Sequence, residues 1–198
     1  SMCIRDSILG ALYFINNINE DDLVKRCRRA LWGNTALFLV FFLAFVIRTL
    51  LADGYAVRPE TGEVFMEPYK YLTNFLQMPV VLLVFLVGVV AVLWGIIRTL
   101  WKPAFDKGIW FAGAGTVLTV LALLLVAGYN NTAYYPSTHD LQSSLTLANS
   151  CSSQFTLKVM AYVSILVPFV LAYIFYAWRS IDNRKIDAKE MEEGGHAY

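Results

Sequence analysis

The sequence predicts an all-α fold: a polytopic membrane helical bundle with four full transmembrane helices and a truncated N-terminal helix. Three observations predict it. The chain of 198 residues is 58% hydrophobic and its mean hydropathy is +0.54, which is too apolar for an ordinary soluble domain. Only 16% of the residues are charged, and most of these lie between apolar runs. Four of the runs reach the roughly 20 residues that a helix needs to cross a bilayer.

The four expected spans are separated by polar segments. They cover residues 31–52, 74–100, 109–129 and 157–178. We expect residues 8–178 to form one transmembrane unit. Residues 179–198 are rich in charge, which is typical of a helix extension that continues into a solvated, disordered tail.

Residues 8–18 form a fifth apolar run, which is too short to span a bilayer. Asparagines and the acidic residues 20–22 follow it directly, so we interpret the run as the end of a helix whose beginning is missing. Arg5 and Asp6 precede it, at a depth where a charge costs at least a few kcal/mol. Residues 1–7 are therefore expected to be a non-native or truncated start. A short amphipathic helix at the membrane interface is the alternative.

The loop after the first span contains several turn-forming sequences. These are Asp53-Gly54, Arg58-Pro59-Glu60 and Thr61-Gly62. Glycine, proline and aspartate in such combinations favour tight turns. The loop is therefore expected to form a short hairpin or to cap the bundle.

Lysine and arginine are distributed unevenly between the two sides of the predicted bundle. They cluster before the first span, between the second and third spans, and after the fourth: Lys25, Arg26, Arg28, Arg29, Arg98, Lys102, Lys107, Arg179, Arg184, Lys185 and Lys189. The loops on the other side contain only Arg58 and Lys70. By the positive-inside rule, the basic segments and both ends of this chain are expected to be cytoplasmic. Four tryptophans fall at the same side, as in an interfacial aromatic belt: Trp32, Trp101, Trp110 and Trp178.

Small residues are the first structural candidates within the spans. The second span carries Gly88 and Gly95, and the third opens with the small residues 112–115. Small residues let helix backbones approach closely in a membrane. We interpret both sets as packing positions, and a cleft beside a cofactor is the alternative.

Two prolines and one arginine are the other structural candidates. Pro79 falls in the first turns of its helix, where a missing backbone hydrogen bond costs little, whereas Pro168 lies near the middle of the last span and should bend it. Arg48 is embedded in the first span about one turn from its outer end. It can snorkel to the headgroups or pair with a nearby carboxylate: Asp53, Glu63 or Glu67. A substrate-facing role is the alternative, because charges inside membranes are usually functional.

No catalytic, cofactor-binding or metal-binding residue is predicted in this chain. The histidines, His139 in an outer loop and His196 near the C-terminus, lie outside the spans, and Met78 and Met160 have no histidine partner. Haem in a bundle needs axial ligands that project inward, so a haem held by this chain alone is not expected. The three cysteines form no CxxC pair, and no acidic residue lies deep in a span. The sequence Asn130-Asn131-Thr132 matches a glycosylation sequon, which we discount. A net charge of +1 gives no indication of a nucleic-acid partner.

Several stretches resemble subunit II of the cytochrome bd quinol oxidases, in versions like those of Bacteroidetes. They are ALYFINNIN at residues 11–19, residues 48–71, GIWFAGAG at residues 108–115, and the loop and last helix at residues 129–178 with its SSQFTL motif. The resemblance extends over nearly everything from residue 8 onward. Proteins of this family are built from two helical bundles, and residues 8–178 are similar to the second one.

The resemblance implies a place in aerobic respiratory electron transport. Enzymes of this family oxidise quinol at the outer membrane face, reduce dioxygen to water, and take protons from the cytoplasm, which makes the reaction electrogenic. The resemblance assigns haems b and d to the partner, subunit I, and implies no cofactor in this chain. It implies a multi-pass protein of the bacterial inner membrane that serves mainly as a scaffold for subunit I, in contact with membrane lipid.

Two other functions fit the same composition. One is a small four-helix membrane transporter or channel subunit, which should show a polar or broken-helix site at the midplane. These spans have little of that beyond Pro168. The other is a membrane scaffold without an enzymatic partner.

Overall fold

The computed structural model describes residues 2–102 and 105–181. Within these residues, four helices are long and apolar enough to cross a membrane: α2 (Asp21–Leu51), α4 (Pro79–Trp101), α5 (Gly108–Gly128) and α6 (Gln154–Ile181). This confirms the all-α fold class and the four predicted transmembrane helices. The smaller elements are α1 (Met2–Asn17), β1 (Gly54–Val57), β2 (Val64–Glu67), α3 (Lys70–Gln77) and the 3-10 turn η1 (Leu141–Ser143).

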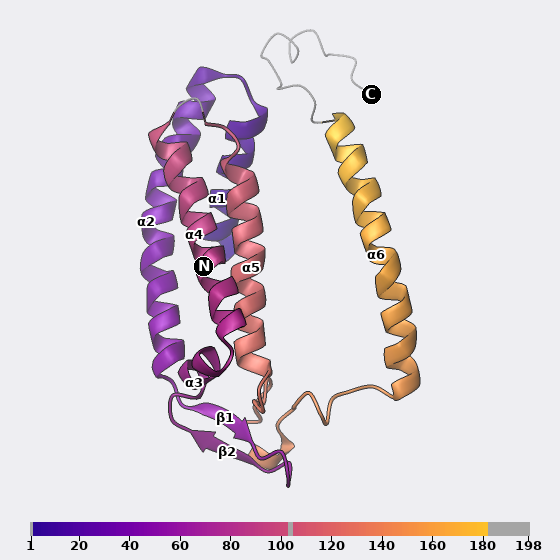
Figure 1. Cartoon of the computed structure of the whole chain (residues 1–198). Coiled ribbons are helices and arrows are strands. Elements are labelled where there is room, and N and C mark those ends of the chain that lie inside the picture. The colour runs from indigo at the N-terminus through magenta and orange to yellow at the C-terminus, as the bar shows by residue number, and fades with distance from the viewer. Residues whose placement is uncertain (1, 103–104, 182–198) are drawn as a thin grey trace.

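Helices α1, α2, α4 and α5 form a bundle, and α6 stands apart from it (Figure 1). The antiparallel helices α4 and α5 make the most extensive contact, and α1 packs against both α2 and α5. The start of α2, the end of α4, the start of α5 and the end of α6 lie at the same end of the molecule. We call it the basic end, because it carries Lys25, Arg98, Lys102, Lys107 and Arg179. The opposite end is called the hairpin end.

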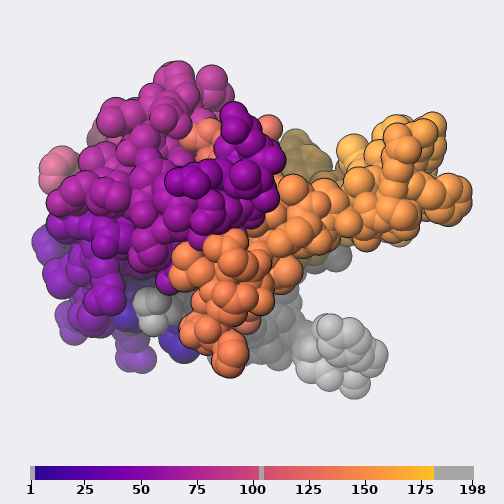
Figure 2. Space-filling model, turned by 90° about the horizontal axis from the view of Figure 1, so that it is seen from below, coloured from indigo at the N-terminus to yellow at the C-terminus, as the bar shows by residue number. Residues whose placement is uncertain are grey.

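The loop after α2 forms the expected hairpin and also covers one end of the bundle. Strands β1 and β2 are antiparallel, with Gly54 opposite Glu67 and Val57 opposite Val64. The turn is closed by hydrogen bonds from the Arg58 amide to the Glu63 carbonyl (2.9 Å) and between their side chains (2.9 Å). Seen from this end, the hairpin and the loop after α5 spread over the bundle (Figure 2).

The predicted start of the second span, at residue 74, is wrong. The sequence predicts one helix over residues 74–100, but α3 ends at Gln77 and α4 begins at Pro79. Met78 between them has φ −115° and ψ 73°, outside the helical region, because the ring of a following proline disfavours helical backbone. Pro79 lies in the first turn of α4, where it removes no helical hydrogen bond. Asn74 therefore belongs to a separate short helix.

Helix α1 is held by an apolar stripe that faces the bundle. Ile8, Leu12 and Ile15 recur at helical spacing and are almost fully buried, together with Leu31 of α2. Arg5 and Asp6 precede this stripe and pair with each other at 3.0 Å on the exposed side. The run at residues 8–18 is thus part of a helix that packs on its neighbours. A second buried cluster, around Phe75 and Phe85, lies near the hairpin end.

Helix α6 is almost unsupported by the rest of the chain. Each of its described side chains except Ala177 is exposed, although the helix is apolar along most of its length. A ring contact with the bundle joins Phe175 to Trp110 of α5, with ring centroids 6.5 Å apart. Pro168 lies inside this single helix. The predicted tail at residues 179–198 begins within α6, and residues 182–198 lie outside the described part of the chain.

Candidate functional site

The contact between α4 and α5 is made by glycines that leave no room for a side chain. A Cβ atom added to Gly88 would lie 2.6 Å from Thr119 Oγ1 and 2.8 Å from the Thr119 amide nitrogen. A Cβ atom added to Gly115 would lie 2.6 Å from the Gly88 carbonyl oxygen. These distances are far inside ordinary van der Waals contact, so the two backbones touch directly. Gly113, in contrast, has nothing within 4 Å of such an atom.

The same arrangement recurs nearer the basic end. A Cβ atom added to Gly95 would lie 2.8 Å from the Gly108 carbonyl oxygen and 3.0 Å from the Ala112 amide nitrogen. We call Gly88, Gly95, Gly108 and Gly115 the glycine seam. The neighbouring hydroxyl groups of Thr99 and Thr119 donate to carbonyls of their own helices, Gly95 O and Gly115 O, at 2.8 Å. The seam is therefore a tight packing surface whose polar atoms already have partners.

A buried polar cluster joins α3 to the end of α5. Asn74 is 0% exposed, and its Nδ2 donates to the Val126 carbonyl and to Thr132 Oγ1, both at 2.9 Å. Its Oδ1 accepts from Asn130 Nδ2 at 3.1 Å, and the same Asn130 amide donates to Gln77. The last four carbonyls of a helix lack partners within the helix, so Asn74 satisfies one of those of α5. We call Asn74, Gln77, Asn130 and Thr132 the Asn74 cluster.

The chain leaves α5 through two residues in the left-handed backbone region. Asn130 has φ 58° and Asn131 has φ 52°, a conformation that asparagine tolerates better than most residues. The chain then runs beside β1, where the Val57 amide donates to Asn131 O at 2.8 Å and the Ala133 amide donates to Tyr55 O at 2.9 Å. The sequence Asn130-Asn131-Thr132 is thus a structural turn that attaches α5 to the hairpin.

The loop between α5 and α6 is bonded to the hairpin through Gln142 and is held together internally by Asn149. Gln142 accepts from the Val64 amide at 3.0 Å and donates to the Val64 carbonyl at 2.9 Å. Asn149 accepts from the Thr146 amide at 2.7 Å and donates to the Ser144 carbonyl at 2.9 Å. The polar sequence of this loop therefore defines its path from α5 to α6.

These polar positions were missed in the sequence because each looks unremarkable alone. Asn74 stands at the edge of an apolar run, where hydropathy predicts the first residue of a span, and Asn130 and Thr132 match a sequon. The available signal was an asparagine next to apolar residues, which needs a buried hydrogen-bond partner. The identity of that partner, 58 residues away, is visible only in the fold.

An ion pair anchors α3 to the hairpin. Lys70 Nζ lies 3.1 Å from Glu67 Oε2, and the lysine side chain is only 9% exposed. Its stem packs over Gly54, where an added Cβ atom would lie 2.5 Å from Lys70 Cβ. Beside it, burial raises the pKa of the Tyr71 phenol, and the nearby Tyr55 raises it further. The lysine therefore fills space as well as carrying charge.

Replacing Lys70 with methionine is expected to destabilise the hairpin end more than replacing Arg58 with methionine. The first change leaves the partly buried Glu67 carboxylate without its partner, whereas the Arg58–Glu63 pair is exposed, and such pairs contribute only about 0–1 kcal/mol. Thermal unfolding of the two purified full-length variants measures the difference. An equal fall in the thermal midpoint of both variants would show that the Lys70–Glu67 pair stabilises the protein no more than the exposed Arg58–Glu63 pair.

Arg48 lies outside the glycine seam and the Asn74 cluster. Arg48 is exposed in the last turn of α2, where a cation is favoured by the negative end of the helix dipole. Two of the carboxylates predicted as its partners are taken, because Glu63 pairs with Arg58 and Glu67 with Lys70. Among the described residues, no ion pair involves Arg48.

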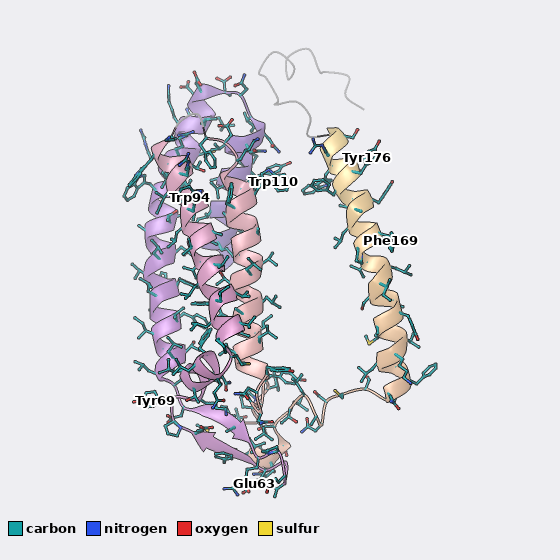
Figure 3. All side chains as sticks on the ribbon, in the orientation of Figure 1. Glu63, Tyr69, Trp94, Trp110, Phe169 and Tyr176 are labelled. Atoms are coloured by element: carbon teal, nitrogen blue, oxygen red, sulfur yellow. The ribbon has the colours of Figure 1, made fainter. Side chains whose placement is uncertain are left out.

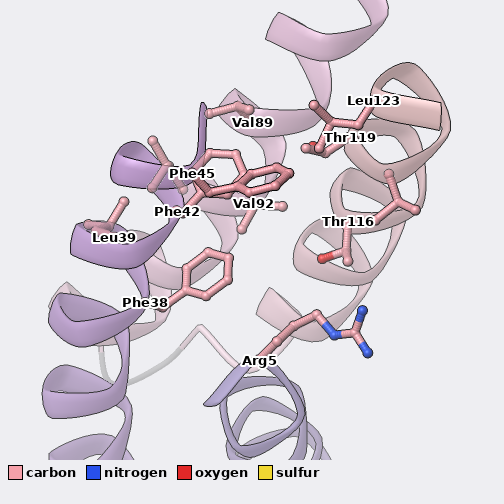
Figure 4. Close-up of a pocket in the computed structure, with 12 residues that line it drawn as sticks. Arg5, Phe38, Leu39, Phe42, Phe45, Val89, Val92, Thr116, Thr119 and Leu123 are labelled. Carbon is pink, nitrogen blue, oxygen red and sulfur yellow. The ribbon is translucent and has the colours of Figure 1, made fainter. Parts of the chain in front are cut away.

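An apolar groove lies on one side of the bundle between α2 and α5, with α4 at its base (Figure 4). Its volume is about 180 Å³, and α2 contributes Phe38, Phe42 and Phe45 to its wall. The hydroxyl groups of Thr116 and Thr119 in the wall donate to carbonyls of α5, so they are already engaged. The groove can take an apolar chain, and the charged residue that lines it is Arg5 of α1.

Candidate metal-binding side chains are scattered in the part of the chain that the structure describes. No group of three or more His, Cys, Asp or Glu side chains lies close enough to hold a metal ion there. His139 is exposed in the loop between α5 and α6, and Met160 is 61% exposed on α6. The contacts described above pack the helices and connect them at the hairpin end.

Comparison with known proteins agrees with this architecture. The sequence profile of the family described as cytochrome bd terminal oxidase subunit II matches residues 3–181. The chain is 30% identical over 155 residues to subunit 2 of the cytochrome bd-I ubiquinol oxidase of Escherichia coli K12, and equally similar to those of strains O6:H1 and O157:H7. The match covers 77% of this chain and 39% of each relative, so the chain spans well under half the length of these proteins. The chain thus belongs to the cytochrome bd terminal oxidase subunit II family.

Proposed function

We propose that this chain forms part of the non-haem membrane subunit of a cytochrome bd-type terminal oxidase. The complex oxidises a quinol and reduces dioxygen to water in aerobic respiration, and this chain acts as scaffold for the haem-bearing subunit I. The relatives carry the name of a ubiquinol oxidase, and we extend that class of reaction to the complex in which this chain takes part.

The observation that carries the proposal is family membership combined with the exposure of α6. An apolar helix of 28 residues with nearly all its side chains exposed has a large surface that the rest of this chain does not cover. Helices in membranes associate through close packing, so such a surface suits contact with other helices as well as with lipid. A scaffold needs this kind of surface, and a self-contained transporter does not.

No described histidine or methionine of this chain is placed as an axial haem ligand inside the bundle. An axial ligand must project from a helix toward the interior of a bundle. The described histidine, His139, lies in an exposed loop, and Met78 precedes α4 at the hairpin end. The haems of the proposed complex, of types b and d, are therefore assigned to subunit I.

For the orientation in the bacterial inner membrane, we propose that the basic end faces the cytoplasm. The ends of α2, α4, α5 and α6 that carry lysine and arginine lie together there, as the positive-inside rule requires of cytoplasmic segments. Trp94 and Trp110 lie toward the same end, and Tyr69 lies at the other (Figure 3). A cysteine placed in the hairpin, labelled by a membrane-impermeant reagent in intact spheroplasts, tests this orientation.

The proposal is tested by purifying the full-length protein from bacterial membranes through an affinity tag. We expect a second large subunit to co-purify, with absorption bands of b- and d-type haem and with quinol-dependent oxygen consumption. A colourless preparation without that subunit would contradict the proposal.

Replacing Arg48 with leucine is expected to reduce the yield of the complex several-fold and to leave turnover per haem unchanged. The side chain is exposed and has no carboxylate partner among the described residues. Its positive charge stabilises the C-terminal end of α2 through the helix dipole. Arg48→Lys keeps that charge and should restore the yield. A fall in turnover with normal assembly would assign Arg48 a role in the reaction.

A further inference from the structure

A pocket lies between α5 and α6 at the basic end of the molecule. Its volume is about 760 Å³, and its walls are formed by α6, the start of α5 and Asn16 near the end of α1. Figure 3 shows Trp110 projecting from α5 toward α6 at this level. The pocket is open between two membrane-spanning helices, so it faces the region where lipid headgroups meet acyl chains.

The rim of the pocket carries two cations and no carboxylate. Lys107 precedes the first turn of α5, and Arg179 lies in the last turn of α6. Within the described residues neither of them forms an ion pair, and no Asp or Glu lines the pocket. The first amides of α5 add to this field, because they carry the positive end of the helix dipole without a side-chain cap. The rim therefore favours an anion.

Below the rim the pocket is apolar. Leu171, Ile174 and Phe175 line it from α6, and Trp110 and Trp178 stand at the boundary between this part and the cations. Indole rings favour the level of the headgroups, because one edge is apolar and the N–H can donate a hydrogen bond. The order of cation, indole and aliphatic side chain along the pocket is the order of phosphate, ester region and acyl chain in a phospholipid.

We propose that this pocket binds an anionic phospholipid. Its phosphate lies between Lys107 and Arg179, and an acyl chain lies along Phe175 and Leu171. Basic pockets between transmembrane helices are the sites at which anionic headgroups bind. A second pocket at the same end, around Trp94 and Arg98, is a weaker candidate, because the Arg98 guanidinium already lies over the rings of Trp94 and Phe105 at 5.2 and 5.6 Å. The site at Lys107 does not depend on the proposed redox function.

The test uses the full-length protein in its native complex, delipidated in mild detergent and titrated with phosphatidylglycerol. Bound lipid is counted by native mass spectrometry. We expect affinity to fall about five-fold for each cation removed in Lys107→Gln and Arg179→Gln, since one cation near an anionic lipid contributes about 1 kcal/mol. Lys25→Gln is the matched control, because its exposed side chain lies at the same end and away from the pocket. It should leave affinity unchanged.

Further measurements keep the proposal open to refutation if Lys107→Gln or Arg179→Gln fails to assemble. Binding of phosphatidylglycerol to the unmodified complex should weaken as salt is raised, and phosphatidylcholine should bind at least five-fold more weakly. Equal binding of the two lipids would overturn the proposal, as would equal binding of glycerol phosphate alone. A photo-crosslinking amino acid in place of Phe175 should label lipid. Labelling of a protein helix with no labelled lipid would also overturn it.

Discussion

Replacing Gly115 with alanine is expected to push α4 and α5 apart and to destabilise the bundle by about 1–3 kcal/mol, the usual cost of forcing an atom into a close-packed interface. The added Cβ atom would lie 2.6 Å from the Gly88 carbonyl oxygen and 2.7 Å from the Val92 amide nitrogen. Both are backbone atoms, so they cannot move aside as a side-chain tip can. The thermal midpoint of the purified full-length protein measures the loss.

The matched control is Gly113→Ala, two residues earlier in the same helix. An added Cβ atom there meets nothing within 4 Å, and alanine favours a helix over glycine by about 1 kcal/mol. This variant should therefore be neutral or slightly more stable. If both variants lose stability equally, the direct backbone contact of the glycine seam does not hold the two helices together.

Replacing Asn74 with leucine is expected to have the second large effect. Leucine has a similar size but cannot replace the hydrogen bonds to Val126 O, Thr132 and Asn130. Each buried polar group left without a partner costs roughly 1–3 kcal/mol. We expect α3 and the turn after α5 to separate locally before the membrane helices do.

Limited proteolysis at the hairpin end detects this local opening. Cleavage between residues 129 and 153 should become faster in Asn74→Leu, while the pattern at the basic end stays the same. Thr73→Val is the control on the neighbouring position, because the Thr73 hydroxyl donates to Tyr69 O within the first turn of α3. Unchanged proteolysis in Asn74→Leu would mean that the cluster can be replaced by apolar packing.

The boundary between α3 and α4 can be predicted only in part from the sequence. Hydropathy rises from Asn74 onward, so the sequence predicts a continuous span with Pro79 within its first turns. The proline is instead the first residue of α4, and Met78 before it is not helical. A residue before proline is biased away from the helix, so this break could have been predicted. That α3 folds back to bury Asn74 under the hairpin could not, because its partners come from α5 and the following loop.

The glycines show the same limit. Gly113 and Gly115 belong to one short run of small residues and are equivalent in composition, yet only Gly115 faces α4. Which side of a helix meets its neighbour depends on its rotation about its axis, and a helix that is apolar all round carries no stripe to reveal it. The hairpin could be predicted from the sequence, since its turn residues favour a turn through their own backbone conformations.

The membrane class, the number of spans, the gathering of basic residues at one end and the resemblance to the family all follow from the amino-acid sequence alone. These properties depend on the length of apolar runs, the order of charges and short motifs, all of which can be identified from the order of residues in the chain. The tertiary structure decided the partner of Asn74, the inward face of the glycine seam, the near isolation of α6 and the pocket between Lys107 and Arg179. Each of these depends on how residues distant in the chain are placed relative to one another, so it exists only once the helices have packed.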